Sequence, residues 1–355
     1  MKQKRKFLKI ISGVCKVLLV VMLIGLVFPT WTPKIEGENS ISELRKVEVN
    51  GEKLQIMIRG CDKDNPIILF VHGGPCWPEI PYVVKYQKEW EEKFTIVHYD
   101  QWGSGKSYQF FKDYSNISAK QHVEDLIALT EYIVDYLEQE QVILIGHSYG
   151  TYIATMAAAQ RPDLFRAYVG IGQVSNKCES ELDSLNKCIL AAENEGNTKD
   201  VTYLESLMDS VKSGEKSTPR KYVRKYGFAA KNIDDNMDYL EGFLLRPEYN
   251  LLDTIRLYTA TILYQDILLE ESANNPVSEL VTEIDVPVYF LMGKYDGMTS
   301  PEAAKRYLDN LQCPQGKEFV LFEDSAHFPQ SEERELFFEW LNETFGENLP
   351  PVGVQ

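Results

Sequence analysis

"VILIGHSYGTYIATM", residues 142–156, places one serine between a strand pattern and a helix pattern. Residues 142–146 form a short apolar run that favours a buried strand, and the small residues after position 150 favour a helix that packs closely on a sheet. Between them, residues 146–150 match G-x-S-x-G. Such a turn needs small residues beside the serine, and it lifts the hydroxyl above the edge of the sheet. Because a strand precedes the motif and a helix follows it, we predict that Ser148 is a nucleophile rather than part of an ordinary turn.

The base that would activate this serine is predicted to be His327. In a strand–serine–helix arrangement of this kind, the partners follow in the order serine, acid and histidine, each in a loop at the carboxyl end of a strand. Only His327, in "FEDSAHFPQ" after the last predicted strand, has this place and order. The other histidines lie in a strand, on a helix, inside the motif, and just before a glycine loop: His98, His122, His147 and His72.

The predicted acid is Asp296, in "MGKYDG", which follows a strand pattern and precedes His327. An acid is needed because it holds the imidazole in one tautomer and stabilises the imidazolium that forms. Asp285 lies at the wrong end of the same strand. Glu323 and Asp324 are near His327 in the chain, but acids in such positions are more typical of solvated loops.

The motif His72-Gly73-Gly74-Pro75 is the predicted second half of an oxyanion hole. A tetrahedral oxyanion takes two backbone donors, one from the residue after the nucleophile and one from a glycine loop. We therefore predict the N–H groups of Tyr149 and Gly74, with Gly73 as the second choice because Pro75 has no N–H. Loss of one such donor costs about 3 kcal/mol in the transition state.

The rest of the chain predicts an α/β fold with a mostly parallel sheet. Asn50-Gly51 between alternating segments predicts a hairpin. Continuous apolar runs typical of strands buried on both faces recur along the chain, at 66–74, 94–100, 142–146, around Tyr168, at 286–293 and at 318–323. A helix pattern from Ser118, with Gln121 in capping-box spacing, and a final helix from Ser331 alternate with these runs. Residues 176–283 are rich in acids and tyrosines, contain no such run, and are predicted to form an inserted helical lid.

The overall composition excludes several classes of function. The 355-residue chain carries a formal net charge of −16, which disfavours nucleic acids and anionic lipid head groups as partners. No Cys/His cluster has the spacing of a zinc site, and the chemistry outlined above implies no cofactor and no metal. The six cysteines are scattered and indicate no disulfide framework. Cys178 and Cys188 are either a pair or, as we favour, two unrelated thiols.

A short segment, "YDQWGSGKSY" at 99–108, resembles the end of a phosphate-binding loop. The full Walker motif needs a glycine five residues before Gly105, so that backbone N–H groups can surround the phosphates. Asp100 stands at that position, and its carboxylate would repel phosphate oxygens. We therefore predict that the segment does not bind nucleotide.

The N-terminus predicts a membrane segment. Five basic residues within the first nine positions precede an apolar stretch, which is uninterrupted over residues 17–28. The stretch reaches helix-spanning length if it starts near Ile10 and Lys16 extends toward the head groups. We expect a signal anchor, with the catalytic domain outside the cell membrane. The alternative is a cleaved signal and a secreted protein, although "FPTWTPKIEG" offers no convincing cleavage site.

Taken together, the motifs resemble the proline iminopeptidase group of α/β-hydrolases. HGGP, D-Q-x-G-x-G-x-S, G-x-S-x-G, G-x-Y-D and A-H-F-P follow one another in the order and at the separations of that family, from about Lys46 to Phe345. The resemblance implies an α/β-hydrolase fold with a helical cap. It also implies Ser148 as nucleophile, Asp296 as orienting acid and His327 as base. In the family, the loop that "DQWGSGKS" matches buttresses the glycine loop and the serine turn.

The chain departs from the family at several positions. Cys76, Trp102 and Tyr149 stand where the family usually has Gly, Arg and Trp. Aminopeptidase members carry a Trp-x-x-Trp-Glu segment in the lid, whose glutamate helps hold the free amino group of the substrate, and this chain has no Trp between Trp102 and Trp340. Acids of the lid are alternative amine anchors, although most are expected to be solvated: Glu179, Glu181, Asp234, Asp235 and Asp238.

These observations predict a serine hydrolase that acts through an acyl-enzyme on a small peptide or acyl ester and is most like a prolyl aminopeptidase. An esterase or lipase acting on small acyl esters is the alternative, and a binding protein on a catalytically silent hydrolase fold is a second one. The predicted division of the chain is an N-terminal segment, two core segments and a cap between them: 1–31, 32–175, 284–355 and 176–283. The oligomeric state stays open.

Overall fold

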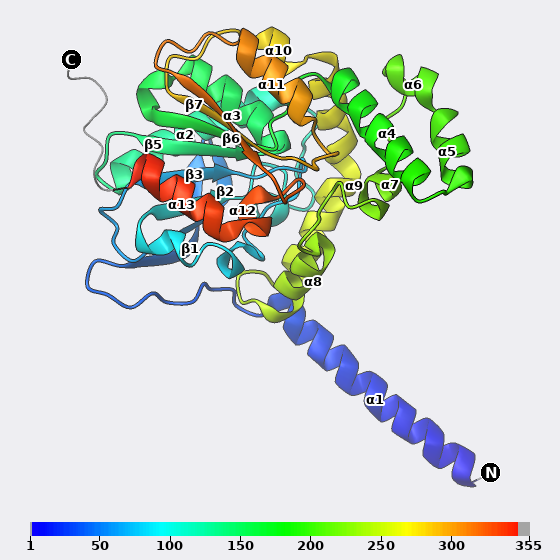
Figure 1. Ribbon diagram of the computed structural model, residues 1–355. Helices are drawn as coiled ribbons and strands as arrows, with labels where there is room; N and C mark the ends of the chain where they lie inside the picture. The colour runs from blue at the N-terminus through cyan, green and yellow to red at the C-terminus, as the bar shows by residue number, and fades with distance from the viewer. Residues whose placement is uncertain (1, 347–355) are drawn as a thin grey trace.

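The central element of the fold is an eight-stranded sheet in the order β1-β2-β4-β3-β5-β6-β7-β8 (Figure 1). The computed structural model describes residues 2–346; residues 347–355, the end of the predicted second core segment, lie outside this range. β2 pairs antiparallel with both of its neighbours, whereas every other pairing is parallel. The strands are β1 (Ile41–Val49), β2 (Glu52–Gly60), β3 (Ile67–Val71), β4 (Thr95–Tyr99), β5 (Val142–His147), β6 (Phe165–Ile171), β7 (Val288–Gly293) and β8 (Lys317–Phe322). The predicted mostly parallel sheet is confirmed.

The predicted hairpin is also present. β1 and β2 are joined at Asn50 and Gly51, with Val49 paired to Glu52. Asn50 has φ 52° and Gly51 has φ 79°. A two-residue turn with both φ values positive matches the right-handed twist of the flanking strands, which is why Asn-Gly is favoured there.

Helices cover both faces of the sheet, as the alternating pattern predicted (Figure 1). Apolar residues of α2 (Ala119–Tyr136), α3 (Tyr149–Gln160) and α11 (Pro301–Asn310) pack in one cluster with side chains such as Leu69 and Leu144 of the sheet. On the other face, Phe337 and Leu341 of α13 (Arg334–Phe345) pack with neighbouring strand residues such as Phe70 and Ile143. Neighbouring residues of one strand therefore serve opposite cores, as expected for strands buried on both sides.

The predicted capping box at the start of α2 is half formed. Ser118 Oγ accepts a hydrogen bond from the N–H of Gln121, which satisfies one of the free donors of the first turn. The Gln121 side chain donates to Asp125 instead of returning to the backbone of Ser118.

Between β6 and β7 the chain forms helices, with no sheet strand among the described residues. The helices are α4 (Lys177–Asn194), α5 (Thr198–Glu205), α6 (Met208–Lys212), α7 (Arg220–Lys225), α8 (Asp235–Leu245), α9 (Leu251–Asn274) and α10 (Val277–Leu280). Those from α4 to α7 share a small apolar core that includes Leu185, Leu204 and Val223. Short helices elsewhere are η1 (Val83–Lys85), η2 (Trp90–Glu92), η3 (Gly105–Ser107), η4 (Pro162–Leu164) and α12 (Pro329–Glu332). The domain boundaries predicted for the cap and the core stay predictions.

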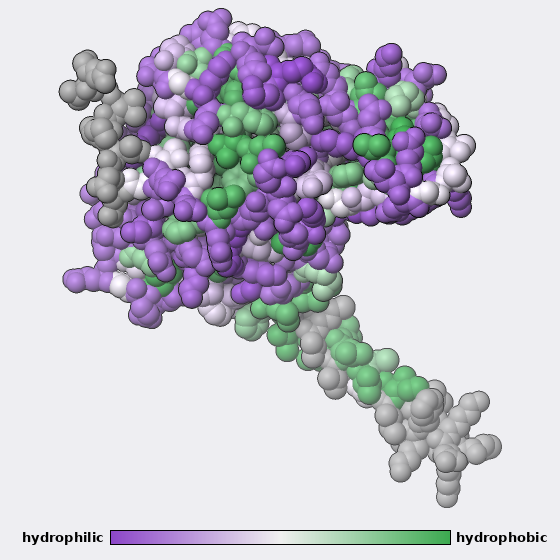
Figure 2. Space-filling model, viewed as in Figure 1, coloured by the Kyte–Doolittle hydropathy of each residue, from purple (hydrophilic) through white to green (hydrophobic). Residues whose placement is uncertain are grey.

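The N-terminal helix α1 (Lys2–Val27) extends away from the sheet (Figure 1). Apolar side chains are exposed on the part of this helix whose side chains are described (Figure 2). The segment after it contacts the lid, because the Phe28 carbonyl accepts from Asn250 and the Trp31 N–H donates to the Pro247 carbonyl. Within the described part of the chain, no helix combines the length and apolar character needed to cross a membrane. The predicted single-pass anchor, with its catalytic domain outside the membrane, was therefore wrong. Lys16 interrupts the apolar stretch, and the uninterrupted run 17–28 is about 18 Å long at 1.5 Å per residue, against about 30 Å of hydrocarbon.

Candidate active site

Ser148 lies at the turn between β5 and α3, as the motif predicted. Its φ of 54° and ψ of −125° fall in a region that residues with a side chain rarely adopt, which is typical of a serine held on a strained strand-to-helix turn. Gly150 explains why the motif needs a glycine on the helix side. A Cβ at that position would lie 2.0 Å from the carbonyl oxygen of Val71 in β3, so only glycine lets the helix approach the sheet this closely.

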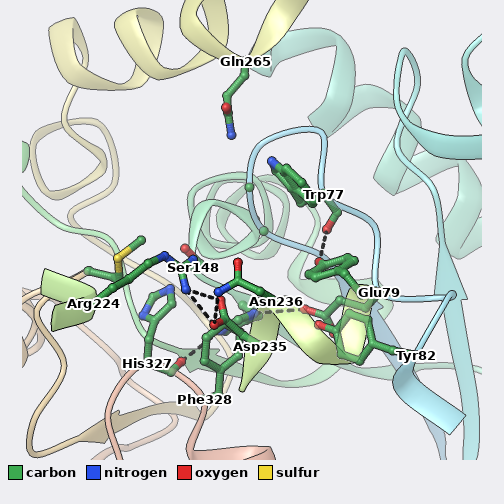
Figure 3. A pocket seen from close by; sticks show the side chains of 15 residues that line it. Trp77, Glu79, Tyr82, Ser148, Arg224, Asp235, Asn236, Gln265, His327 and Phe328 are labelled. Atoms are coloured by element: carbon green, nitrogen blue, oxygen red, sulfur yellow. Dashed lines mark hydrogen bonds and ion pairs between the residues drawn. The ribbon is translucent and has the colours of Figure 1, made fainter. Parts of the chain in front are cut away.

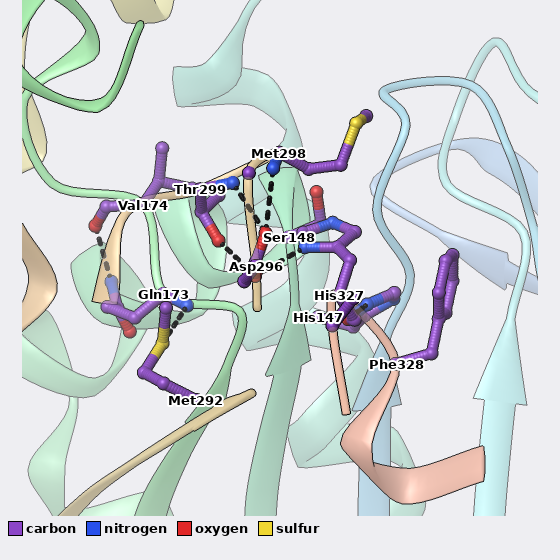
Figure 4. Close-up of polar contacts among 12 residues, drawn as sticks. His147, Ser148, Gln173, Val174, Met292, Asp296, Met298, Thr299, His327 and Phe328 are labelled. Carbon is purple, nitrogen blue, oxygen red and sulfur yellow. Dashed lines mark hydrogen bonds and ion pairs between the residues drawn. The ribbon is translucent and has the colours of Figure 1, made fainter. Parts of the chain in front are cut away.

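His327 and Asp296 are hydrogen-bonded to each other, with 2.8 Å between His327 Nδ1 and Asp296 Oδ2 (Figure 4). Both side chains are buried, and Asp296 is fully so. The Asp296 carboxylate also accepts from the N–H of Met298 at 2.8 Å, and from the N–H and the hydroxyl of Thr299 at 2.9 and 2.7 Å. Burial alone would raise the pKa of Asp296, but His327 and these donors outweigh it and hold the pKa below its ordinary value.

The loop after β6 allows this pair to sit close to the serine turn. Gly172, at φ 55°, lies directly beneath the histidine, and a Cβ there would approach His327 Cε1 to 2.9 Å. The N–H of Ser148 donates to the Ile171 carbonyl at 2.9 Å, so the same loop also anchors the nucleophile. Among the described residues, no hydrogen bond joins the Ser148 hydroxyl to His327, although both line one cavity.

The glycine loop after β3 lies next to Ser148. A Cβ on Gly73 would come within 2.8 Å of Ser148 Cβ. In the described part of the chain, neither the Gly74 N–H nor the Tyr149 N–H donates a hydrogen bond to another protein group. The loop is fastened to α9 by Gln265, whose Nε2 donates to the Pro75 carbonyl at 3.3 Å.

Ser148 and His327 open into a cavity of about 250 Å³ (Figure 3). The core and the lid both contribute to it, and both aromatic rings and charged groups line its wall. The lining residues are Gly73, Gly74, Trp77, Glu79, Tyr82, His147, Ser148, Arg224, Asp235, Asn236, Tyr239, Gln265, Met298, His327 and Phe328. Trp77 and Glu79 were not predicted, although both follow the HGGP motif within a few positions. No sequence signal marks the lid residues that reach the cavity from three helices: Arg224 from α7, Asn236 and Tyr239 from α8, and Gln265 from α9.

Only one of the lid acids considered as amine anchors lines the cavity. Asp235 does so, and its carboxylate accepts both hydrogen bonds of Arg224 Nη1, at 2.6 and 2.9 Å. The others are bonded elsewhere. Glu179 pairs with Arg306, Glu181 with Arg220, Asp238 with Lys85, and Asp234 caps α8.

The remaining histidines and acids have structural contacts. His98 is hydrogen-bonded to Gln87 and His122 to the Trp102 carbonyl, and burial lowers the pKa of these two histidines to about 3 and about 4. The acids weighed against Asp296 lie at the surface, where they interact with lysine or glutamine side chains: Asp285 with Gln315, Glu323 with Lys294, and Asp324 with Lys231.

The loop 100–107 binds protein groups where a Walker loop would bind phosphate. Asp100 Oδ2 accepts from the Lys106 N–H at 2.7 Å and from the Tyr249 hydroxyl at 2.5 Å. Burial raises the pKa of Asp100 to about 7, against the opposing effect of these donors. Gln101 donates from its N–H to His72 Nε2 and from its side chain to the His72 carbonyl, so this loop supports the residue just before Gly73. The cysteines, including Cys178 and Cys188, are unpaired.

Comparison with known proteins identifies the family. Residues 66–334 match the family model described as the alpha/beta hydrolase fold. The chain belongs to the α/β-hydrolase fold family. This hydrolase is 30% identical over 316 residues to the probable aminopeptidase YbaC of Bacillus subtilis, covering 87% of this chain and 98% of the relative.

More distant relatives support the predicted resemblance to the proline iminopeptidases. The hydrolase is 23% identical over 292 residues to the proline iminopeptidase of Saccharolobus solfataricus, covering 79% of this chain and 84% of the relative. The crystal structure of a proline iminopeptidase from Mycobacterium smegmatis shares the fold, with a TM-score of 0.61 and 12% identity over 85% of this chain and 97% of the other. The predicted family and the α/β-hydrolase fold are confirmed, whereas the inserted cap stays a prediction.

Proposed function

We propose that this hydrolase cleaves an amide or ester through an acyl-enzyme formed on Ser148, with His327 as base and Asp296 as orienting acid. One observation carries the proposal. Ser148 sits on a strained strand-to-helix turn and shares its cavity with a buried histidine, and the Nδ1 of that histidine is held by a fully buried carboxylate. A carboxylate in this place keeps the Nδ1 proton on the ring, so that Nε2 is free to take the proton of the serine hydroxyl.

The proposed reaction has two steps. Ser148 Oγ bonds to the acyl carbon while its proton moves to His327 Nε2, and the resulting imidazolium gives that proton to the leaving amine or alcohol. Water then attacks the acyl-enzyme, with His327 again as base, and Ser148 leaves with the returned proton. The N–H groups of Gly74 and Tyr149 are the proposed oxyanion donors, with Gly73 as the second choice. These steps call for no cofactor or metal.

The relatives favour a peptide with an N-terminal proline as the substrate, and therefore aminopeptidase activity. The relatives include proteins named as a probable aminopeptidase and as a proline iminopeptidase. The cavity is small, about 250 Å³, and the rings of Trp77, Tyr82, Tyr239 and Phe328 line it. Such a cavity suits a compact apolar ring next to the scissile carbonyl. Asp235, the lid acid that lines the cavity, is the proposed partner of the free amino group of a peptide.

A small acyl ester is the second candidate, because the charges of the cavity are already paired. Asp235 is bonded to Arg224, and Glu79 is bonded to His147. A substrate ammonium group would have to share a carboxylate with a resident cation, which lowers the gain from binding it. An uncharged ester makes no such demand.

Ser148→Ala tests the nucleophile. The variant should fold with an unchanged circular dichroism spectrum and lose turnover, and it should not react with a fluorophosphonate probe. Full activity in a folded Ser148→Ala protein would overturn the assignment, whereas an unlabelled wild-type protein would favour a catalytically silent binding protein. The ratio of rates on a prolyl anilide with a free amino end and on a short p-nitrophenyl ester, each corrected with Ser148→Ala, then decides between the two substrate classes.

A further inference from the structure

His147, the residue before the nucleophile, lies between two hydrogen-bond acceptors. Its Nδ1 is 2.9 Å from Glu79 Oε1. Its Nε2 is 3.0 Å from the main-chain carbonyl oxygen of His327 (Figure 4). Both side chains of the pair are buried, with 3% of His147 and 4% of Glu79 exposed. Among the described residues, His147 is the only donor found for the His327 carbonyl.

The second of these bonds fixes where a proton must be. A carbonyl oxygen only accepts, so the bond to His327 requires a proton on Nε2 of His147. When Glu79 is ionised, Nδ1 must carry a proton as well, and the ring is then an imidazolium. A neutral histidine beside an ionised glutamate has one ring proton and can make only one of the two contacts. The pair needs one additional proton to make both.

The surroundings favour retention of this extra proton. The groups that face the ring are Glu79, the His327 ring at 5.0 Å between centroids, Asp296 and His72. Burial lowers the pKa of His147, but the hydrogen bond and charge of Glu79, together with the His327 carbonyl and Asp296, outweigh burial and raise the pKa above 6.5. His72 does not add a positive charge near neutral pH, because burial lowers its pKa to about 3.

We propose that Glu79 and His147 form a positioning pair for the base, holding the main chain of His327 while Asp296 holds its ring. This inference rests on the proposed role of His327. His147 does not touch the reacting atoms in this scheme. It acts by holding the loop that carries His327 in the position from which His327 Nε2 can contact the Ser148 hydroxyl.

The pair makes the position of the base sensitive to pH. When the pair loses its extra proton, the remaining ring proton stays on Nδ1, where the carboxylate of Glu79 attracts it. The Nε2 lone pair of His147 then faces the lone pairs of the His327 carbonyl, and the two repel. A displaced base costs about ten- to a hundredfold in rate. The rate should therefore fall at alkaline pH, once His147 loses its proton.

The test is the second-order rate at which a fluorophosphonate labels Ser148 in the full chain between pH 5 and 10, read by mass spectrometry. This reaction needs the activated serine but no knowledge of the natural substrate. Wild type should show an alkaline fall of about ten- to a hundredfold. Glu79→Gln should abolish the fall, because the amide introduced by this substitution donates to Nδ1 of the neutral ring, so that Nε2 keeps a proton when the ring is neutral as well as when it is charged.

Two further variants complete the test. His147→Gln, which offers a non-titrating amide N–H toward the His327 carbonyl, should also lose the alkaline fall, and it serves if Glu79→Gln does not fold. Asp238→Asn is the matched control: this buried carboxylate is bonded to Lys85 and Tyr86, does not line the cavity, and should leave the wild-type profile unchanged.

The outcomes distinguish failure of the positioning role from failure of the proposed function. A wild-type protein labelled at Ser148 without an alkaline fall, or a Glu79→Gln profile that superimposes on the wild-type one, overturns the positioning role and leaves the proposed function standing. A wild-type protein that takes no label at Ser148 at any pH overturns the proposed function, and the positioning role with it.

Discussion

Replacing Asp296 by asparagine should abolish turnover without unfolding the protein, because the contacts of this carboxylate dictate how the amide will sit. Oδ1 accepts two backbone N–H bonds, from Met298 and Thr299, whereas Oδ2 accepts from His327 Nδ1 and the Thr299 hydroxyl. An asparagine oxygen must take the Oδ1 place, since an NH₂ group there would face two donors. The NH₂ group then points at His327 Nδ1.

That orientation reverses the tautomer of the base. His327 Nδ1 has to accept from the amide, so the ring proton moves to Nε2, which can no longer take the proton of Ser148. Replacing an orienting acid in this way lowers turnover about 10⁴-fold. This loss corresponds to an increase of about 5.4 kcal/mol in the activation free energy, at 1.36 kcal/mol per tenfold. Folding should be little affected, because both backbone N–H groups keep their acceptor and the Thr299 hydroxyl can accept from the NH₂ group. Asp296→Ala is a poorer test, since two buried N–H groups would lose theirs at about 1–3 kcal/mol each.

The assay is kcat on the p-nitrophenyl ester for purified Asp296→Asn, with urea unfolding to measure stability. Asp324→Asn is the control, since this acid is exposed at the surface beside Lys231 and should keep wild-type turnover. A folded Asp296→Asn protein with more than about one tenth of wild-type kcat would refute the tautomer argument. The lowered pKa of Asp296 adds a second readout: its stabilising effect is present above its ordinary pKa of 3.8 and is lost as pH falls through its lower folded value. Wild type should therefore lose more stability than Asp296→Asn on acidification.

Three other predictions concern the surroundings of the site. Without reductant, Ellman's reagent should titrate all six cysteines after unfolding. In the native protein, only the exposed thiols of Cys15, Cys61 and Cys178 should react fast, because burial raises the pKa of Cys76 and Cys188 to about 12. Fast labelling of Cys76 in the native protein would contradict this prediction. Asp100, with its pKa raised to about 7, stabilises the fold most below pH 3.8 and loses this effect as pH rises through 7, so the fall in unfolding free energy between about pH 4 and 7 should be smaller in Asp100→Asn than in wild type. Gln265→Ala removes the bond to the Pro75 carbonyl beside the oxyanion loop, and it should slow fluorophosphonate labelling about fivefold, equivalent to about 1 kcal/mol; an unchanged rate would mean that the loop holds its shape without α9.

The sheet and the turn at Ser148 could be predicted from the sequence because their determinants are local. Gly146 to Gly150 encode the turn in five consecutive residues, and chain order then selects Asp296 and His327 from the other acids and histidines. Parallel strands end at one edge of a sheet, so loops that follow different strands meet there. The predicted acid and base are in fact hydrogen-bonded.

The wall of the cavity could not be predicted in the same way, because tertiary packing decides it. Asp235 and Asp238 are three residues apart in one acidic stretch, yet only Asp235 lines the cavity, whereas Asp238 is bonded to Lys85. His147 was recognised as part of the motif, but its partners lie 68 and 180 residues away in the chain. The prediction for the N-terminal segment was wrong for a different reason. Its positive charges and apolar residues fit a membrane helix only if the charge of Lys16, within the apolar stretch, is discounted.

The arrangement of charge around Ser148 suggests why the chain keeps two buried carboxylates beside one nucleophile. An unpaired carboxylate in the cavity would repel the oxyanion of the transition state, which Gly74 and Tyr149 are proposed to stabilise. Asp296 is bonded to His327, and Glu79 is bonded to His147, so neither presents an uncompensated negative charge to the serine once both rings are protonated. In the proposed scheme His327 gains its proton only as the tetrahedral intermediate forms, whereas His147 holds its proton beforehand. The Glu79–His147 pair is then already charge-compensated while the pair of Asp296 and His327 is still being completed.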